Sequence, residues 1–257
     1  MKKEERNTIL RRVLWIVLGF CLTGLSISAV EHKKEMYTSG LEIEVLLLED
    51  GDNLITKEDI EKEVIDVFGQ VEQILIRNLD VQLMEEILIS NPFMKDVDVY
   101  VDAHQQLNVR VQQREPMLRI MSVSDGDYYL DREGIKIPVS PHYTVRVPIA
   151  NGYVPVMKEE QVTEESNRVT RSLFHIAQTI HSDVFMSSLI DQVYVDDKKQ
   201  IILIPKIGAK RIMVGDSSRL KDKVERLKIF YKEAIPSFAW EKYQQLDLRY
   251  EGQVVCK

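Results

Sequence analysis

The sequence contains little cysteine, glycine or proline. There are 2 Cys, 11 Gly and 8 Pro among 257 residues. Two cysteines are too few for a disulfide framework or for a zinc site built from four thiolates. The low glycine and proline content, together with 44% hydrophobic residues, excludes collagen-like repeats and wholesale disorder. The chain is therefore globular, and its length suits one or two modest domains.

The sequence also lacks the short motifs of the common enzyme classes. It contains no P-loop, GxGxxG, HExxH, GxSxG or CxxC. His175 and His181 are six residues apart, so they do not share a helix face as a pair of metal ligands would. We therefore interpret the chain as a non-enzyme, with no catalytic residues, no metal site, no cofactor and no small-molecule substrate.

Basic residues are outnumbered and unevenly placed. The 34 Lys and Arg against 41 Asp and Glu give a net charge of -7, which argues against nucleic acid as a partner. Residues 1–12 nevertheless contain five basic and two acidic side chains, a net charge of +3. The remainder carries 29 basic and 39 acidic side chains, a net charge of -10.

An uncharged apolar run, VLWIVLGFCLTGLSISAV, occupies residues 13–30. As a helix rising 1.5 Å per residue it would be about 27 Å long, close to the hydrocarbon thickness of a bilayer. Arg11 and Arg12 can snorkel to the headgroups, and Trp15 favours the interface. These three residues are the expected membrane anchor of a single transmembrane helix.

The charge asymmetry predicts the orientation of this helix. The five basic residues before the run outweigh Lys33 and Lys34 directly after it, which Glu31 and Glu35 balance. Residues 1–12 are therefore expected to form a cytoplasmic tail, with residues 31–257 outside the cytoplasm. The alternative is a cleaved signal peptide, with Val13–Leu22 as its apolar region and Ser26-Ile27-Ser28 as its cleavage site.

Residues 41–111 show the pattern of a small α+β domain. The alternation at the start of residues 41–48 predicts a strand, and Thr56 followed by Asp59 predicts the start of a helix that ends at Gly69. A second helix is expected over residues 80–90, with Leu83, Ile87 and Leu88 on its apolar face. A hairpin follows, and its buried positions are Val97, Val99, Val101, Leu107, Val109 and Val111.

Residues 112–257 have shorter runs and frequent turn signals, which predict a mixed β domain with two helices. The helices are expected over residues 163–182, with a stripe through Leu173 and Ile176, and from Ser217 or Ser218 to Ala234. The expected strands are residues 128–130, 135–137, 143–149, 192–195, 200–204, 211–214, 245–250 and 253–255.

The strand predicted over residues 245–250 is a candidate interaction edge. Leu246, Leu248 and Tyr250 fall on one face, and Asp247 and Arg249 on the other. A strand at a sheet edge exposes unpaired N–H and C=O groups that can accept a strand from another protein. The alternative is that this is an ordinary strand, whose apolar residues alternate because one of its faces packs over the core.

Several of these segments resemble the FtsQ/DivIB family of bacterial division proteins. The resemblance rests on Asn91-Pro92-Phe93, on VRVQQREP at residues 109–116, and on Tyr128-Tyr129-Leu130-Asp131 followed by Gly134 and Pro138. It continues through Trp240, Tyr243, LDLRY at residues 246–250 and Gln253-Val254-Val255. The resemblance implies an anchor at residues 13–30, a POTRA domain at residues 41–111 and a β domain at residues 112–257.

The resemblance also implies a function and a binding surface. It implies a scaffold in the inner (cytoplasmic) membrane at the division site, with a periplasmic C-terminus, that binds FtsB and FtsL and helps control septal peptidoglycan synthesis by FtsW and FtsI. In the family, FtsB adds a strand beside the last strand. Arg249 and Tyr250 match the binding positions, and Leu248, Gln253 and Val254 are their neighbours.

Two other classes remain open from the residues alone. POTRA units also occur in envelope transport and protein-assembly machines, but these need a transmembrane barrel, and residues 112–257 lack its long lipid-facing alternation. An anchored envelope hydrolase would need convergent catalytic groups, which the sequence does not offer.

Overall fold

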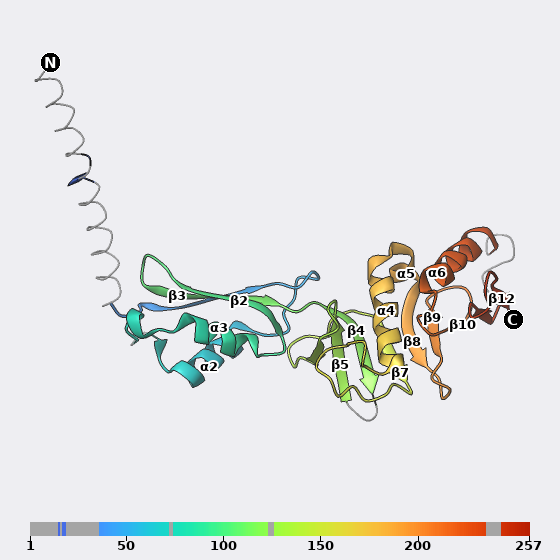
Figure 1. Cartoon of the computed structure of the whole chain (residues 1–257), viewed down its shortest axis with the longest axis horizontal. Coiled ribbons are helices and arrows are strands. Elements are labelled where there is room, and N and C mark those ends of the chain that lie inside the picture. Colours follow the sequence, from blue (N-terminus) through green and yellow to red (C-terminus); the bar gives the residue numbers. More distant parts are fainter. Residues whose placement is uncertain (1–14, 16, 19–35, 72–73, 123–125, 235–242) are drawn as a thin grey trace, which may run out of the picture. The chain divides into compact units, whose positions relative to one another are not determined.

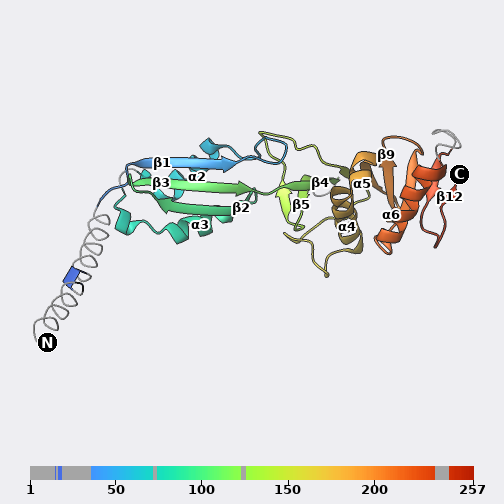
Figure 2. The same ribbon diagram turned by 90° about the horizontal axis from the view of Figure 1, so that it is seen from above.

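The structure is a computed structural model that describes residues 15, 17–18, 36–71, 74–122, 126–234 and 243–257. Figures 1 and 2 show it in two views at right angles. Most of the apolar run at residues 13–30, together with Arg11 and Arg12, lies outside the described residues, and Trp15 is 67% exposed. Among the described residues, no helix combines the length and the apolar character needed to cross a bilayer. The membrane anchor stays a prediction.

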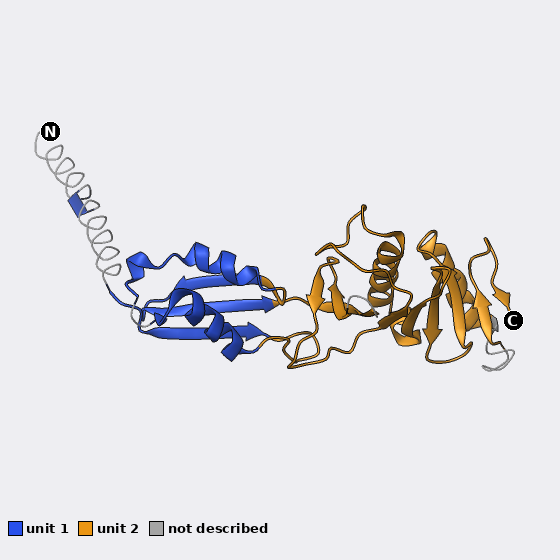
Figure 3. Ribbon diagram, turned by 90° about the horizontal axis from the view of Figure 1, so that it is seen from below, with its two compact units in different colours: residues 1–46, 56–91, 96–112 blue, residues 47–55, 92–95, 113–257 orange. Residues whose placement is uncertain are grey.

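The chain forms two compact units, which Figure 3 colours separately. The first unit contains residues 1–46, 56–91 and 96–112. The second contains residues 113–257 and two short segments, residues 47–55 and 92–95. Both units combine helices with a β-sheet, so the fold is α+β, as the sequence predicts.

The first unit is a three-stranded sheet with two helices on one face (Figures 1 and 2). Its elements are β1 (Gly40–Leu46), α2 (Lys57–Phe68), η2 (Ile76–Asn78), α3 (Val81–Ile89), β2 (Met94–Val101) and β3 (Gln106–Gln113). The strand order is β1-β3-β2, and β1 runs parallel to β3 with Ile43 opposite Val109. The observed order is therefore the predicted strand, helix, helix, strand, strand.

The ends of α2 follow from its sequence. Thr56 and Asp59 form a reciprocal capping box, in which the Asp59 amide donates to Thr56 Oγ1 at 3.2 Å and the Thr56 amide donates to Asp59 Oδ2 at 3.0 Å. Gly69 ends the helix at φ 78°, a conformation that glycine adopts without strain. In α3 the buried residues are Met84 and Leu88, whereas the predicted Leu83 is 45% exposed.

The second unit is built on a nine-stranded sheet with the order β12-β11-β10-β9-β8-β7-β4-β5-β6. Its strands are β4 (Pro116–Ser122), β5 (Gly126–Asp131), β6 (Lys136–Pro138), β7 (Ile149–Gly152), β8 (Ile190–Val195), β9 (Ile201–Pro205), β10 (Arg211–Gly215), β11 (Gln245–Asp247) and β12 (Val255–Cys256). The hairpins predicted around residues 131–134 and 196–199 are confirmed.

One face of this sheet is covered by α4 (Arg168–Ser182), α5 (Val184–Leu189) and α6 (Leu220–Ile229), which continues into the π-helical turn η3 (Phe230–Ala234). The predicted stripe of α4 is buried in that core, and it consists of Val169, Leu173, Ile176, Ala177 and Ile180. On α6 and η3, Val224, Leu227 and Tyr231 are buried in the same core. The sequence predicted two helices here, and α5 is a third.

The strand predicted over residues 143–149 is wrong except at its last residue. Only Ile149–Gly152 forms a strand, and residues 143–148 are irregular, with a three-residue turn closed by the Val147 amide on the Val145 carbonyl at 3.2 Å. Pro148 has no N–H to give to a ladder, and its carbonyl accepts one hydrogen bond from the Arg119 amide at 2.9 Å. Both neighbours of β7 continue past Ile149, since β4 begins at Pro116 and β8 at Ile190. The segment therefore leaves the sheet because of its own turn and proline, and not for want of a strand beside it.

The predicted cap of α6 is also wrong. The residue before the helix is Arg219, which has a left-handed conformation with φ 49° and makes no side-chain capping bond. Ser218 instead donates its hydroxyl to Asp216 Oδ1 at 2.5 Å. The predicted strand at residues 245–250 is shortened to Gln245–Asp247, and the one at residues 253–255 is observed at Val255–Cys256.

Candidate partner-docking edge

The last strand in the chain, β12, forms one end of the nine-stranded sheet. It pairs antiparallel with β11, and β11 pairs parallel with β10 through the contacts of Leu246 with Ile212 and of Asp247 with Met213. Among the residues that the structure describes, only one side of β12 is therefore paired. A two-residue strand with an open side is a site at which another strand can be added.

The hydrogen-bond register shows which groups of β12 face outward. Gln245 and Lys257 exchange two backbone bonds, from the Lys257 amide at 2.9 Å and from the Gln245 amide at 3.0 Å. In an antiparallel ladder such reciprocal pairs alternate with non-bonded pairs. Asp247 with Val255 is then the next reciprocal pair, and Leu246 with Cys256 is a non-bonded pair. The backbone N–H and C=O of Cys256 therefore point away from β11.

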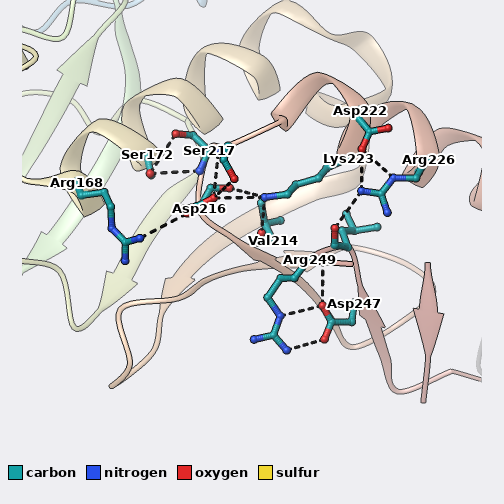
Figure 4. Close-up of polar contacts among 12 residues, drawn as sticks. Arg168, Ser172, Val214, Asp216, Ser217, Asp222, Lys223, Arg226, Asp247 and Arg249 are labelled. Atoms are coloured by element: carbon teal, nitrogen blue, oxygen red, sulfur yellow. Dashed lines mark hydrogen bonds and ion pairs between the residues drawn. The ribbon is translucent and has the colours of Figure 1, made fainter. Parts of the chain in front are cut away.

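Arg226 of α6 holds the loop between β11 and β12 (Figure 4). Its guanidinium donates to the Leu248 carbonyl at 3.1 Å, to the Tyr250 carbonyl at 2.8 Å and to the Gln253 carbonyl. It also pairs with Asp222, one turn earlier, at 3.0 Å. The Arg226 side chain is only 11% exposed. The largely buried Arg226 guanidinium thus holds three backbone carbonyls of the segment that leads into β12.

Lys223 fixes the start of α6 against β10. This buried ammonium donates to the Val214 carbonyl at 2.9 Å and to the Asp216 carbonyl at 3.0 Å (Figure 4). Burial lowers the pKa of Lys223, because the charged form loses its hydration. The pKa of Asp216 is also lowered, chiefly by the Ser218 hydroxyl bond and further by the charge of Lys223. The helix that carries Arg226 is therefore anchored beside the sheet edge.

Asp247 and Arg249 form an ion pair on the side of the sheet opposite the core. Arg249 Nε lies 2.9 Å from Asp247 Oδ1, and Arg249 Nη2 lies 2.6 Å from Asp247 Oδ2. The Arg249 amide donates to the same carboxylate at 3.1 Å. Hydrogen bonds from Arg249 lower the pKa of Asp247, whose side chain is only 3% exposed. The pair fixes the backbone immediately before Tyr250.

We expect the Asp247→Asn variant to lose about 1–3 kcal/mol of stability at neutral pH, because the Arg249 guanidinium loses its charged partner. Since folding lowers the pKa of Asp247, this contribution is present above the carboxyl's unfolded pKa and is lost as pH falls through the folded pKa. Urea denaturation of both proteins across this acid range should therefore show the difference shrinking as pH falls. A pH-independent difference would mean that packing, rather than charge, dominates.

The sequence-predicted residues occupy different positions at this edge. Tyr250 is 51% exposed, and Arg249 and Gln253 are also exposed. Val254 is half-buried and packs against the core, while Leu248 is 1% exposed within it. Leu248 therefore supports the edge from inside, and its side chain has no surface to offer to a partner.

Sequence reasoning missed Arg226, which donates to three backbone carbonyls of this loop. The only local signal is its spacing of four residues from Asp222, a pattern typical of exposed helix pairs. Gln253, a neighbour of the binding positions that the resemblance implies, lies before β12, and the backbone groups of β12 that face outward are those of Cys256.

The chemistry of this edge is that of recognition by backbone hydrogen bonds and exposed side chains. Within the described ranges, no group of three or more His, Cys, Asp and Glu residues is placed to hold a metal ion. The edge presents the outward groups of Cys256, the exposed Tyr250 ring and the Arg249 guanidinium. These groups suit a protein strand as the ligand.

Comparison with known proteins gives one assignment. No curated protein matches the chain. The family model described as "FtsQ/DivIB, C-terminal related" matches residues 115–257, which is more than half of the chain and includes the whole docking edge. The chain belongs to the FtsQ/DivIB family, whose members are non-enzymatic scaffolds of the cell-division machinery.

Proposed function

We propose that the chain is a membrane-anchored division scaffold that binds FtsB, together with FtsL, by adding a strand of FtsB to β12. The open side of β12 carries this proposal, because the Cys256 backbone groups point away from β11. Through these partners the scaffold acts indirectly on FtsW and FtsI and so on septal peptidoglycan synthesis. The family assignment supports the division role.

The proposal extends to the rest of the chain. Residues 13–30 form the single transmembrane helix, with Arg11, Arg12 and Trp15 at its cytoplasmic boundary, residues 1–12 in the cytoplasm and the remainder outside it. Residues 41–111 form a POTRA domain, which is supported by the β-α-α-β-β order of the first unit. Residues 112–257 form the β domain that docks the partner.

We expect the Tyr250→Ala variant to weaken FtsB binding by roughly tenfold while lowering the melting temperature by only a few degrees. The Tyr250 ring is 51% exposed, so removing it takes away contact area without opening a cavity in the core. Titration of the full chain with FtsB, beside thermal denaturation, measures both effects. A melting temperature that collapses while the folded fraction binds normally would make Tyr250 a structural residue.

Leu248→Ala is the matched control for this measurement. It lies two residues away, but its side chain is buried in the core, so truncation should cost about 2–5 kcal/mol of stability. The two variants should therefore separate binding from folding. If both variants lose stability and affinity in parallel, the exposed face of the loop is not a docking surface.

A photocrosslinking residue at position 250 in living cells tests the identity of the partner. Capture of FtsB supports the proposed scaffold. Capture of unfolded envelope proteins favours the alternative of a transport or protein-assembly component, and the strand-addition proposal would then lose its proposed partner.

A further inference from the structure

A cavity of about 550 Å³ lies in the second unit, where β4, β7 and β8 begin. In the strand order it is separated from β12 by β9, β10 and β11, so it is distinct from the docking edge. Its apolar lining comes from three elements and the segment before β7, and it includes Met117, Val145, Val147, Ile180 and Ile190. A cavity of this size with an apolar floor suits a ligand that buries carbon as well as charge.

The charged groups that line the cavity are mainly cationic. Arg119, Arg146 and Lys206 line the cavity with one carboxylate, Asp191. Within the described part of the chain, neither Arg146 nor Lys206 has an ion-pair partner. Lys206 Nζ makes only a long bond of 3.4 Å to the Ser187 carbonyl. This cluster is unusual in a chain of net charge -7.

Arg119 adds an unsatisfied donor to this cluster. Its Nη2 pairs with Asp127 at 2.7 Å, and its guanidinium lies 5.8 Å from the centre of the Tyr129 ring. Its Nε is buried and has no hydrogen-bond partner among the described residues. Because this nitrogen is closed off from solvent, Arg119 contributes charge to the cavity wall rather than a hydrogen bond to a ligand.

One wall of the cavity is the irregular segment at residues 144–148. It has the alternating, β-branched sequence of a strand but no strand partner. Val147 donates to the Val145 carbonyl at 3.2 Å, whereas the amides of Thr144, Val145 and Arg146 make no hydrogen bond to any residue that the structure describes. The bond from Val147 to Val145 closes a tight turn centred on Arg146, so the wall offers three backbone donors that have no partner among the described residues, next to an apolar floor.

We propose that this cavity binds an extended segment of a partner protein in which acidic side chains alternate with apolar ones. The apolar side chains fill the floor, the carboxylates pair with Arg146 and Lys206, and the backbone bonds to the Thr144–Arg146 wall. A small free anion would satisfy the cations but would leave the apolar floor empty. Charge complementarity and the free amides together favour a peptide.

The test uses a capped, fluorescein-labelled peptide of alternating glutamate and valine, about seven residues long, so that it spans about 20 Å when extended. Fluorescence anisotropy with the full chain should show saturable binding. Binding should weaken by roughly tenfold for the Arg146→Glu/Lys206→Glu double variant, because each exposed cation is replaced by a carboxylate that repels the glutamates of the peptide. An analogue peptide with glutamine in place of glutamate should bind the wild type more weakly, by a similar factor.

The control is the Lys57→Glu/Lys62→Glu double variant, which changes the net charge equally on α2 and should bind the peptide as the wild type does. Thermal denaturation of both variants checks folding. The proposal is overturned if binding does not saturate, if the cavity variant binds normally, or if the glutamine peptide binds equally well. It is also overturned if inorganic phosphate or free glutamate displaces the peptide at matched concentration, since the cavity would then be a site for small anions.

Discussion

The Arg226→Met variant should lose partner binding by on the order of 100-fold, equivalent to about 2.7 kcal/mol. Arg226 fixes the Leu248, Tyr250 and Gln253 carbonyls from a single side chain that is 11% exposed. Methionine keeps much of the apolar stem but supplies no donor. The loop would then lose the contacts that position β12, and an added strand would have to order that loop itself.

The fold itself should survive this change. The three carbonyls lie in a loop where water can replace the lost donors, and the cost in stability should be about 2–3 kcal/mol. Hydrogen exchange of the full chain measures the local effect without a partner, because the Val255 amide should lose protection while the amides of β8 and β9 keep it. FtsB titration then measures the loss of binding.

Arg219→Met is the matched control. Arg219 also bonds to this loop, through a 2.7 Å ion pair with Glu251, but its side chain is 43% exposed and that of Glu251 is 82% exposed. Such a pair contributes about 0–1 kcal/mol. We expect little change in exchange or binding for Arg219→Met. If both variants lose binding affinity equally, net positive charge near the loop controls docking, rather than the hydrogen bonds of the Arg226 guanidinium.

Local signals explain which parts of the fold could be predicted from the sequence. The helices α2 and α4 and the hairpins of β2 with β3 and of β8 with β9 each bury one periodic stripe within a short stretch of chain. The segment at residues 143–148 has the same alternation, but it turns at Arg146 and contains Pro148, so it does not pair although β4 and β8 both continue past the register of Ile149. The α5 helix was missed because six residues are too few to show a helical period.

The candidate site was predictable only in part for a similar reason. One strand is predicted to contain the buried Leu248 and the exposed Arg249 and Tyr250. The observed strand β11 ends at Asp247, so the strand pattern does not decide which of these three residues is buried. Arg226 lies more than twenty residues earlier, and its contacts are to backbone carbonyls, which carry no sequence signature. Long-range contacts to the backbone therefore need the structure.

The Cys256→Pro variant should fold normally but lose roughly tenfold or more of its affinity for FtsB. Proline removes the amide hydrogen of Cys256, which points away from β11, and places a ring where a partner strand would lie. The bonds that β12 makes to β11 come from Val255 and Lys257, so the internal ladder stays complete. The melting temperature should therefore stay within a few degrees of that of the wild type.

Two further variants separate the possible causes of that loss. Cys256→Ala removes the thiol but keeps the outward amide, and it should bind as the wild type does. Val255→Pro removes an amide that faces β11, so it should weaken exchange protection of β12 and binding together. Proline at position 255 should therefore affect both the folding of β12 and docking, whereas proline at position 256 should affect docking alone. If Cys256→Pro binds FtsB normally, the partner does not add a strand to β12, and the docking surface must be formed by exposed side chains such as Tyr250.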